Sequence, residues 1–320
     1  MRFVPDAFAK VVYQILDNPW DFLHPMASFF GHYGVHIFLF LSGYGLAKKC
    51  LMSHALTVGA LYRTAFSQIL KIVKLTLLGL CFYMLFYLVK DGSFPSFDVM
   101  AKYLGFLTFT ENLRPGKLYY FVSVWWFLAL IVQFYLVFPL LFRAMQERPT
   151  VMLGASFISL AAAALLYKPL LAVNVHVYAT PLAHMPVFAL GMYFAFGHTV
   201  DRTTAGLGMI LIPLTFVWEE AFHLSFVLVT LAAIAFYCRY LRGLTRSSVL
   251  KFIGAISMFV YIVHGEMRWD LINWANAEQT ALVIYGAFVG YLAAVLAVAC
   301  ICRELVVRYN FCWLGPARRS

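Results

Sequence analysis

The feature that most constrains this chain is a series of long apolar stretches that recur between residues 29 and 302. Most are roughly 17 to 25 residues long, which as a helix is enough to cross about 30 Å of hydrocarbon. The composition agrees, because 63% of the residues are hydrophobic, only 12% are charged and the mean hydropathy is +0.82. A soluble globular domain cannot bury that much apolar surface. We therefore predict an all-α fold, a polytopic bundle of transmembrane helices.

The apolar stretches predict nine membrane helices and three regions of the chain. Residues 1–28 form a polar segment without the apolar core of a signal peptide. Residues 29–302 form the transmembrane domain, and residues 303–320 form a basic tail. The nine expected helices are 29–47, 69–89, 119–142, 151–167, 181–197, 204–219, 221–238, 250–267 and 280–302.

The basic residues indicate how these helices are oriented. Sixteen of the 24 lysines and arginines fall on one side of the alternating loops, starting with Lys48 and Lys49. Positive charge is enriched in cytoplasmic loops, so we place the C-terminus in the cytoplasm and the segment 1–28 outside it. The net charge of +10 comes from short clusters and not from one basic face. We therefore expect membrane lipids, and not nucleic acid, as partners.

Cysteine and histidine spacing gives no sign of a metal or a disulfide framework. His176 and His184 flank one outer turn, but no set of three or four ligands at suitable spacing accompanies them. We predict no metal and no bound cofactor. The six cysteines lie mostly inside or beside apolar stretches; they are Cys50, Cys81, Cys238, Cys300, Cys302 and Cys312.

Three apolar segments carry polar or aromatic residues in a distinctive order. The first is GVHIFLFLSGYGL at 34–46, the second is LYYFVSVWWFLALIVQFYLVFPLL at 118–141, and the third is FIGAISMFVYIVHG at 252–265. In this order and spacing they resemble the signatures of the acyltransferase-3 superfamily, the O-antigen acetylase-like integral membrane acyltransferases. The resemblance covers residues 29 to about 302.

The chain departs from that superfamily at its start. The resemblance implies ten helices, the first of which carries an Arg and, eleven residues later, a His that is regarded as catalytic. Here Arg2 is followed at that spacing by Tyr13. Because nine helices are predicted and the N-terminus is expected outside, we expect that the first helix is lacking from this chain.

Two histidines inside the apolar segments are the leading catalytic candidates, His36 and His264. An ionisable residue at the centre of a membrane helix costs about 2.5 to 3.5 kcal/mol, so it marks a candidate site. A neutral imidazole can take the proton of an acceptor hydroxyl as its oxygen attacks a thioester. Ser42 and Tyr261 could donate hydrogen bonds to the developing oxyanion or fix a histidine tautomer. A structural role at the helix end is the alternative for His36.

The glycines next to Ser42 have two interpretations. Gly43 and Gly45 could let a substrate approach the backbone closely. They could equally be contacts through which membrane helices pack, since small residues let helices come close together.

Basic residues on the inner side are candidate donor-binding residues. Arg63, Lys71 and Lys74 could pair with the phosphates of an acyl-coenzyme A, which we expect as the co-substrate. Attraction to anionic lipid headgroups would account for the same residues.

Residues on the outer side are candidate acceptor-binding residues. Trp125 and Trp126 could stack on a sugar, although interfacial tryptophans also anchor helices at the headgroup level. Glu219 could bind a hydroxylated acceptor together with His223. A solvated turn is the alternative for Glu219, Glu220 and His223.

The resemblance implies an O-acyltransferase in a bacterial inner membrane. It would move an acyl group, most simply acetyl, from a cytoplasmic acyl donor to a hydroxyl of an extracytoplasmic glycan or lipid-linked sugar. One alternative is a transporter or flippase of lipid-linked saccharides, which would use the same buried polar residues as a path. A catalytically inactive truncated homologue, acting as a scaffold, is another.

Overall fold

In the computed structural model the described part of the chain is mostly helical. The structure describes residues 12–13, 16, 31, 33–54, 56–94, 96–118, 122, 124–200, 202–217, 222–241, 243, 247–278 and 281–308. Helix makes up 87% of it, and no strand occurs in this part of the chain. The predicted all-α fold is confirmed.

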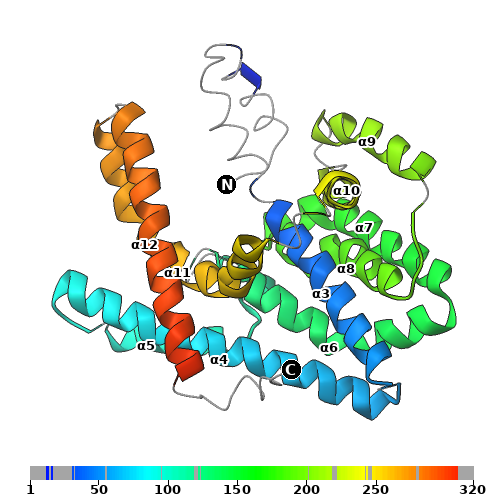
Figure 1. Cartoon of the computed structure of the whole chain (residues 1–320), viewed down its shortest axis with the longest axis horizontal. Helices are drawn as coiled ribbons and strands as arrows, with labels where there is room; N and C mark the ends of the chain where they lie inside the picture. Colours follow the sequence, from blue (N-terminus) through cyan, green and yellow to red (C-terminus); the bar gives the residue numbers. More distant parts are fainter. Residues whose placement is uncertain are drawn as a thin grey trace. The chain divides into compact units, whose positions relative to one another are not determined.

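Ten α-helices occur among the described residues, and Figure 1 labels them. Two short 3₁₀ turns, η2 (Glu111–Leu113) and η3 (Val177–Ala179), and a π-helical turn, η4 (Tyr237–Leu241), lie between them. The helices are α3 (Tyr33–Met52), α4 (Val58–Asp91), α5 (Phe97–Phe106), α6 (Trp126–Glu147), α7 (Pro149–Ala172), α8 (Pro181–Ala195), α9 (Arg202–Val217), α10 (Phe222–Phe236), α11 (Ser248–Glu278) and α12 (Ala281–Arg308).

Each of the nine predicted helices corresponds to a helix in the structure. By length and composition, seven helices in the described ranges can cross a membrane: α3, α4, α6, α7, α10 with η4, α11 and α12. The other two, α8 and α9, have 15 and 16 residues and are shorter. Helix α5 was not predicted, because Asp98 and Lys102 break its apolar pattern.

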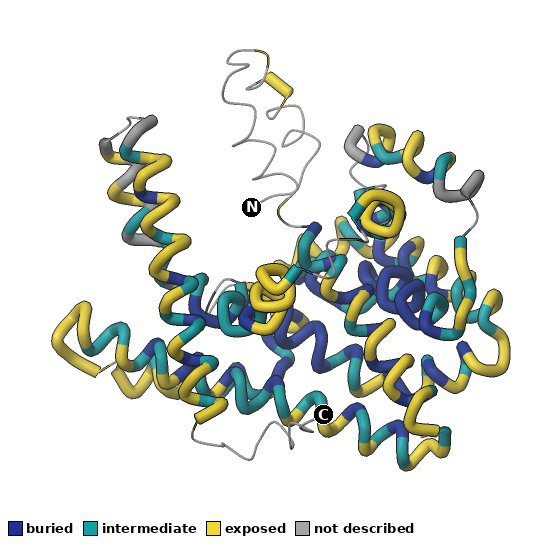
Figure 2. The backbone as a smooth tube through the Cα atoms, viewed as in Figure 1, coloured by how far each residue is buried: buried dark blue, intermediate teal, exposed yellow. Residues whose placement is uncertain are grey.

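The chain divides into two compact units, and the division falls within α4 and α6. Unit 1 comprises Met1–Phe66 and Gln133–Arg242. Its central element is α8, which packs against α3, α7 and α10. Ten of the 15 residues of α8 are buried, and Figure 2 shows this helix mostly in dark blue. A helix that is apolar all round belongs in a protein interior, which explains why α8 can be short.

Unit 2 comprises Ser67–Val132 and Gly243–Ser320. Helices α11 and α12 pack along each other in this unit. Its core contains three large aromatic side chains, because Trp125 lies 5.3 Å from Tyr83 and 5.4 Å from Phe106 between ring centroids. All three rings are buried.

The outer faces of several helices are apolar and exposed. On α7, Ile158 and Leu165 are exposed, and on α12, Phe288 and Val289 are exposed. Figure 2 shows these two helices largely in yellow and teal. Side chains of this kind are stable where lipid, and not water, covers them. The pattern is that of helices in contact with a bilayer.

Candidate functional site

Three buried histidines lie together in unit 1, one each on α3, α8 and α10. His36, His184 and His223 are 3%, 1% and 2% exposed. The rings of His36 and His184 are 5.0 Å apart between centroids. The ring of Phe226 on α10 lies 4.0 Å from His36, 5.2 Å from His184 and 5.6 Å from His223. We refer to these three histidines and Phe226 as the histidine cluster.

A hydrogen bond between α3 and α10 supports the histidine cluster. The Tyr33 and Ser225 hydroxyl oxygens are 2.6 Å apart. Ser225 donates its own hydrogen to the carbonyl of Phe222 at 2.5 Å, so Tyr33 is the donor to Ser225. The Tyr33 ring is 5.5 Å from that of His36. Both helices are thus tied together beside the buried imidazoles.

A backbone carbonyl sets the tautomer of His184. Its Nε2 lies 2.5 Å from the carbonyl oxygen of Tyr178. A carbonyl oxygen only accepts, so Nε2 carries the hydrogen and the neutral ring has its lone pair on Nδ1. His176, outside the membrane helices, packs beside Tyr178 at 5.2 Å between ring centroids. Partial burial lowers the pKa of His176.

Glycines let α3 and α8 approach closely enough to bring the two histidines together. A Cβ atom on Gly43 would collide with the carbonyl oxygen of Phe188, and one on Gly191 would collide with that of Phe40. The contacts are reciprocal, and His36 and His184, each seven residues before its glycine, also lie side by side, so α3 and α8 run parallel. The predicted packing role of Gly43 is confirmed, whereas Gly45 faces open space.

The same short pattern occurs in both helices. Residues 36–43 read HIFLFLSG and residues 184–191 read HMPVFALG, so each has His, then Phe four residues later, then Gly after three more. The two histidines are equally far from the glycines on which the helices pack, which matches their position at the same level. Sequence reasoning missed His184 as a site residue, and this repeated spacing is the signal that would have identified it.

His223 corrects one of the sequence interpretations. A solvated turn was the favoured alternative for this residue, but its side chain is buried against Phe226 and lies 5.8 Å from the Tyr167 ring. The charged residues Glu219 and Glu220 come shortly before His223 in the sequence and favoured a turn there. In the structure α10 begins at Phe222, and His223, its second residue, is buried. Glu219 and Glu220 lie outside the described residues.

Ser42 does not lie beside His36. It is six residues further along α3, about 9 Å along the helix axis at 1.5 Å per residue. Ser42 is half-buried and makes a side-chain hydrogen bond with Tyr135 of α6. The structure thus pairs Ser42 with a tyrosine within unit 1.

His264 of unit 2 is held by its own helix. Its Nδ1 lies 2.8 Å from the carbonyl oxygen of Tyr261 and 3.2 Å from that of Val260. Nδ1 therefore carries the hydrogen, and Nε2 of the neutral ring has the lone pair. The Tyr291 hydroxyl donates to the His264 carbonyl at 2.8 Å. This is the tautomer that a proton-accepting imidazole requires.

Tyr261 and Trp125 fix the part of α11 that carries His264. Tyr261 donates its hydroxyl hydrogen to the carbonyl of Val124. The indole Nε1 of Trp125 donates to the Ile262 carbonyl at 3.2 Å, and the Tyr83 hydroxyl reaches the same oxygen at 3.3 Å. Trp125 is fully buried, so in this arrangement it presents no free face to a sugar. Trp126 is half-buried at the start of α6.

Replacing Trp125 by Phe should destabilise the protein by about 1 kcal/mol, because the Ile262 carbonyl loses one of its donors. The measurement is the unfolding midpoint in detergent micelles. Trp126→Phe removes a similar ring from a half-buried position and should change the midpoint less. Equal effects of the two substitutions would contradict the structural role given to the Trp125 hydrogen bond.

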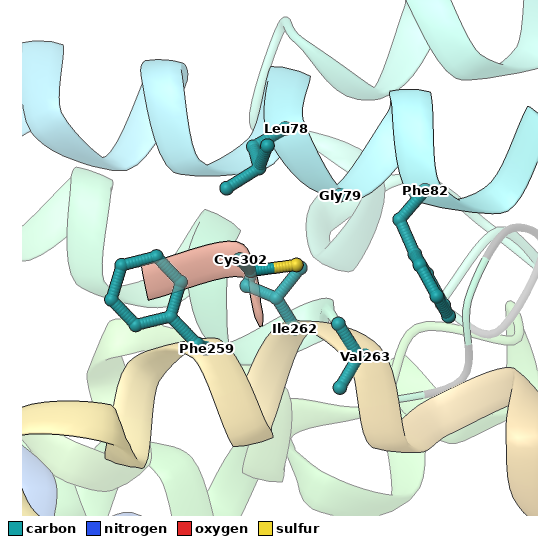
Figure 3. Close-up of a pocket in the computed structure, with 7 residues that line it drawn as sticks. All are labelled: Leu78, Gly79, Phe82, Phe259, Ile262, Val263 and Cys302. Carbon is teal, nitrogen blue, oxygen red and sulfur yellow. The ribbon is translucent and has the colours of Figure 1, made fainter. Parts of the chain in front are cut away.

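An apolar seam lies next to this part of α11, where α4, α11 and α12 meet (Figure 3). Its empty volume is about 170 Å³, but the side chains leave no room in it for a water molecule. It is therefore a packing seam and not a substrate cavity. The lining residues are Leu78, Gly79, Phe82, Phe259, Ile262, Val263 and Cys302.

The three candidate donor-binding cations all lie on α4. Arg63 is exposed in the part of this helix that belongs to unit 1. Lys71 and Lys74 are half-buried in the part that belongs to unit 2. Because the two lysines are three positions apart, they share one face of the helix.

Histidines, cysteines and carboxylates in the described part of the chain form no group of three that could hold a metal ion. In the histidine cluster the Phe226 ring, which cannot bind a metal, packs against His36 and His184 in place of a further metal ligand. The chemistry available to the cluster is hydrogen bonding and proton transfer by the imidazole rings.

These features define an integral membrane protein whose described part is mainly helical, with titratable side chains buried in both of its units. The chain belongs to the acyltransferase-3 family: the family model, described as an acyltransferase domain, matches residues 5–303. The resemblance seen in the three sequence segments is confirmed, and the protein is a membrane acyltransferase. No curated protein and no solved structure matches the chain.

Proposed function

We propose that this protein transfers an acyl group, most simply acetyl, from a cytoplasmic acyl-coenzyme A to a hydroxyl of an extracytoplasmic glycan. A bacterial inner membrane, with the C-terminus in the cytoplasm, is the proposed location. Family membership supports acyl transfer in general. The observation that carries the proposal further is the tautomer of His264, whose Nδ1 is tied to its own helix while Nε2 has the lone pair.

The proposed base is His264. Its Nε2 takes the proton of the acceptor hydroxyl as the oxygen attacks the thioester carbon. The new carbon–oxygen ester bond forms, and the carbon–sulfur bond breaks with its electron pair on sulfur. The imidazolium then returns the proton to the thiolate, so no proton is gained or lost overall.

The tyrosine next to this base has a positioning role. Tyr261 was predicted to donate to an oxyanion or to fix a histidine tautomer. In the structure its hydroxyl is engaged by the Val124 carbonyl, and its own carbonyl accepts from His264. We propose that Tyr261 holds His264 in its tautomer, which leaves the oxyanion donor to another group.

Binding of the two substrates is proposed from charge and polarity. Arg63, Lys71 and Lys74 would meet the phosphates of the acyl donor, because cations matched to phosphates make charge-assisted hydrogen bonds. Glu219 and Trp126 would contact the glycan. His36 and Ser42 remain proposed catalytic residues of unit 1.

The test uses purified protein in nanodiscs with radiolabelled acetyl-coenzyme A and a glycan fraction from a bacterial envelope. We expect thiol release and label in the glycan that mild alkali removes, since esters are alkali-labile and amides are not. A transporter or an inactive scaffold would release no thiol above the level of empty nanodiscs. That result would reject the proposed function.

A further inference from the structure

We propose that the guanidinium of Arg268 donates hydrogen bonds to the oxyanion that forms when the acceptor oxygen attacks the thioester carbon. This inference rests on the proposed function and names the oxyanion donor that the engagement of the Tyr261 hydroxyl leaves open. The three sequence segments do not indicate Arg268, because it lies three residues beyond the end of the third.

Arg268 lies one helical turn from the proposed base. His264 and Arg268 are four positions apart on α11, so they share one face of the helix, with about 5 to 6 Å between their Cβ atoms. A thioester carbonyl that lies between the two side chains can direct its oxygen to Arg268 while the attacking hydroxyl contacts His264. The spacing therefore suits a base and an oxyanion donor that act on one substrate.

Arg268 belongs to a small group of residues in unit 2. Its charge interacts electrostatically with His264 and with Tyr291 of α12. Tyr291 donates to the His264 carbonyl at 2.8 Å, so the three residues lie close together. Arg268 is half-buried, and its Nε is shielded from solvent. A guanidinium has five N–H donors, so donors remain for a substrate where others already have partners in the protein.

Helix α12 indicates how deep this group lies in the membrane. The apolar stretch of α12 runs from Ala281 to Cys302 and is followed by Arg303. Tyr291 lies at the middle of this stretch, about 15 Å along the helix from either end. Because the Tyr291 hydroxyl reaches the His264 carbonyl, His264 lies near the middle of the apolar layer.

Helix α4 gives the same depth independently. The Tyr83 hydroxyl donates to the Ile262 carbonyl of α11 at 3.3 Å. Tyr83 lies nine residues after Lys74 and seven before Lys90, and no charged residue occurs between these two lysines. Tyr83 is therefore also near the middle of an apolar stretch, so α4 and α12 agree on the depth of this part of α11.

Arg268 is thus a charge within the apolar layer. It lies one turn, about 6 Å, from His264 toward the outer end of α11. A charged side chain at that depth is costly and by default marks a functional site. The low dielectric constant strengthens its attraction for a negative oxygen, so hydrogen bonds from Arg268 stabilise the oxyanion more than they would in water. Arg268 transfers no proton while the ester bond forms and the carbon–sulfur bond breaks.

The test measures single-turnover thiol release from acetyl-coenzyme A in nanodiscs. We expect Arg268→Gln to lower the rate by about 10²- to 10³-fold, as the loss of one oxyanion donor does. Arg268→Lys keeps the charge but lacks the planar pair of donors, so its rate should lie between those of Arg268→Gln and the wild type. The half-saturating concentration of acetyl-coenzyme A should change by less than about threefold, because the oxyanion exists only in the transition state.

Chemical modification separates the charge of the side chain from its size. Arg268→Cys should be as slow as Arg268→Gln. Its reaction with 2-aminoethyl methanethiosulfonate restores a positive charge and should raise the rate by about tenfold or more. The sulfonate reagent of similar size adds a negative charge and should not. The wild type is treated in the same way, because the chain has six cysteines of its own.

The matched control variant is Arg114→Gln. Arg114 is an exposed arginine of unit 2 that lies 3.7 Å from the Glu111 carboxylate. This variant should release thiol at the wild-type rate. A loss equal to that of Arg268→Gln would mean that removal of any arginine from this unit slows the reaction, and it would overturn the role of Arg268.

Other outcomes also decide. A rate of Arg268→Gln within about threefold of the wild type would overturn the proposal, as would equal recovery with both reagents or a loss confined to the half-saturating concentration. If only Arg268→Lys folds, a slower rate at unchanged half-saturation supports the proposal and a wild-type rate rejects it. An inactive wild type would reject the proposed function and this role with it, whereas an active wild type with a fully active Arg268→Gln rejects this role alone.

Discussion

His264→Asn should lower the rate of acyl transfer by about 10²- to 10⁴-fold while the protein stays folded, the range that general-base catalysis typically contributes. The amide nitrogen of asparagine lies where Nδ1 lies in histidine, so it can still donate to the Tyr261 carbonyl. What the variant lacks is the lone pair at the position of Nε2. The measurement is single-turnover thiol release from acetyl-coenzyme A in nanodiscs, with the unfolding midpoint recorded in parallel.

The matched control is His54→Asn. His54 is an exposed histidine in the turn after α3, and its backbone φ of 51° is one that asparagine adopts more readily than most residues. This control should react at the wild-type rate. Activity of His264→Asn within about threefold of the wild type, on a scale where loss of a base costs 10²-fold or more, would remove His264 from the mechanism.

The sequence predicted the positions of the helices correctly where a long apolar stretch marks them. It did not predict the helix ends where polar residues belong to the same helix. The apolar window for the second helix starts at residue 69, yet α4 begins at Val58, because the polar residues Arg63 and Gln68 belong to the same continuous helix. For the same reason α11 extends past residue 267 to Glu278. Hydropathy identifies the residues that lipid tolerates, whereas a helix ends where its backbone hydrogen bonds end. The two boundaries need not coincide.

Only part of the candidate site could be predicted from the sequence. His36 and His264 stand inside long apolar segments, where a titratable residue is conspicuous. His184 and His223 stand near the ends of expected helices, next to turns, where a polar residue is not conspicuous. Their burial depends on the mutual packing of α3, α8 and α10, which is tertiary structure. The tautomers of His184 and His264 depend on single carbonyl contacts that no spacing encodes.

Gly43→Ala should destabilise the protein by about 1 to 3 kcal/mol, the usual cost of overpacking. The new methyl group would press on the carbonyl of Phe188, and a backbone carbonyl cannot turn away as a flexible side chain can. Gly45→Ala, two residues along the same helix, faces open space and should be neutral or stabilising, because alanine is the better helix former. The unfolding midpoint in detergent micelles measures both.

The reciprocal contact supplies a stricter form of this prediction. Gly191→Ala should cost about as much as Gly43→Ala, since its methyl group would meet the Phe40 carbonyl in the same way. Once one methyl group has forced α3 and α8 apart, the second enters a gap that already exists. The double variant should therefore be more stable than the sum of the two losses predicts. Strict additivity would mean that the two glycines do not share one interface, and the side-by-side placement of His36 and His184 would lose its cause.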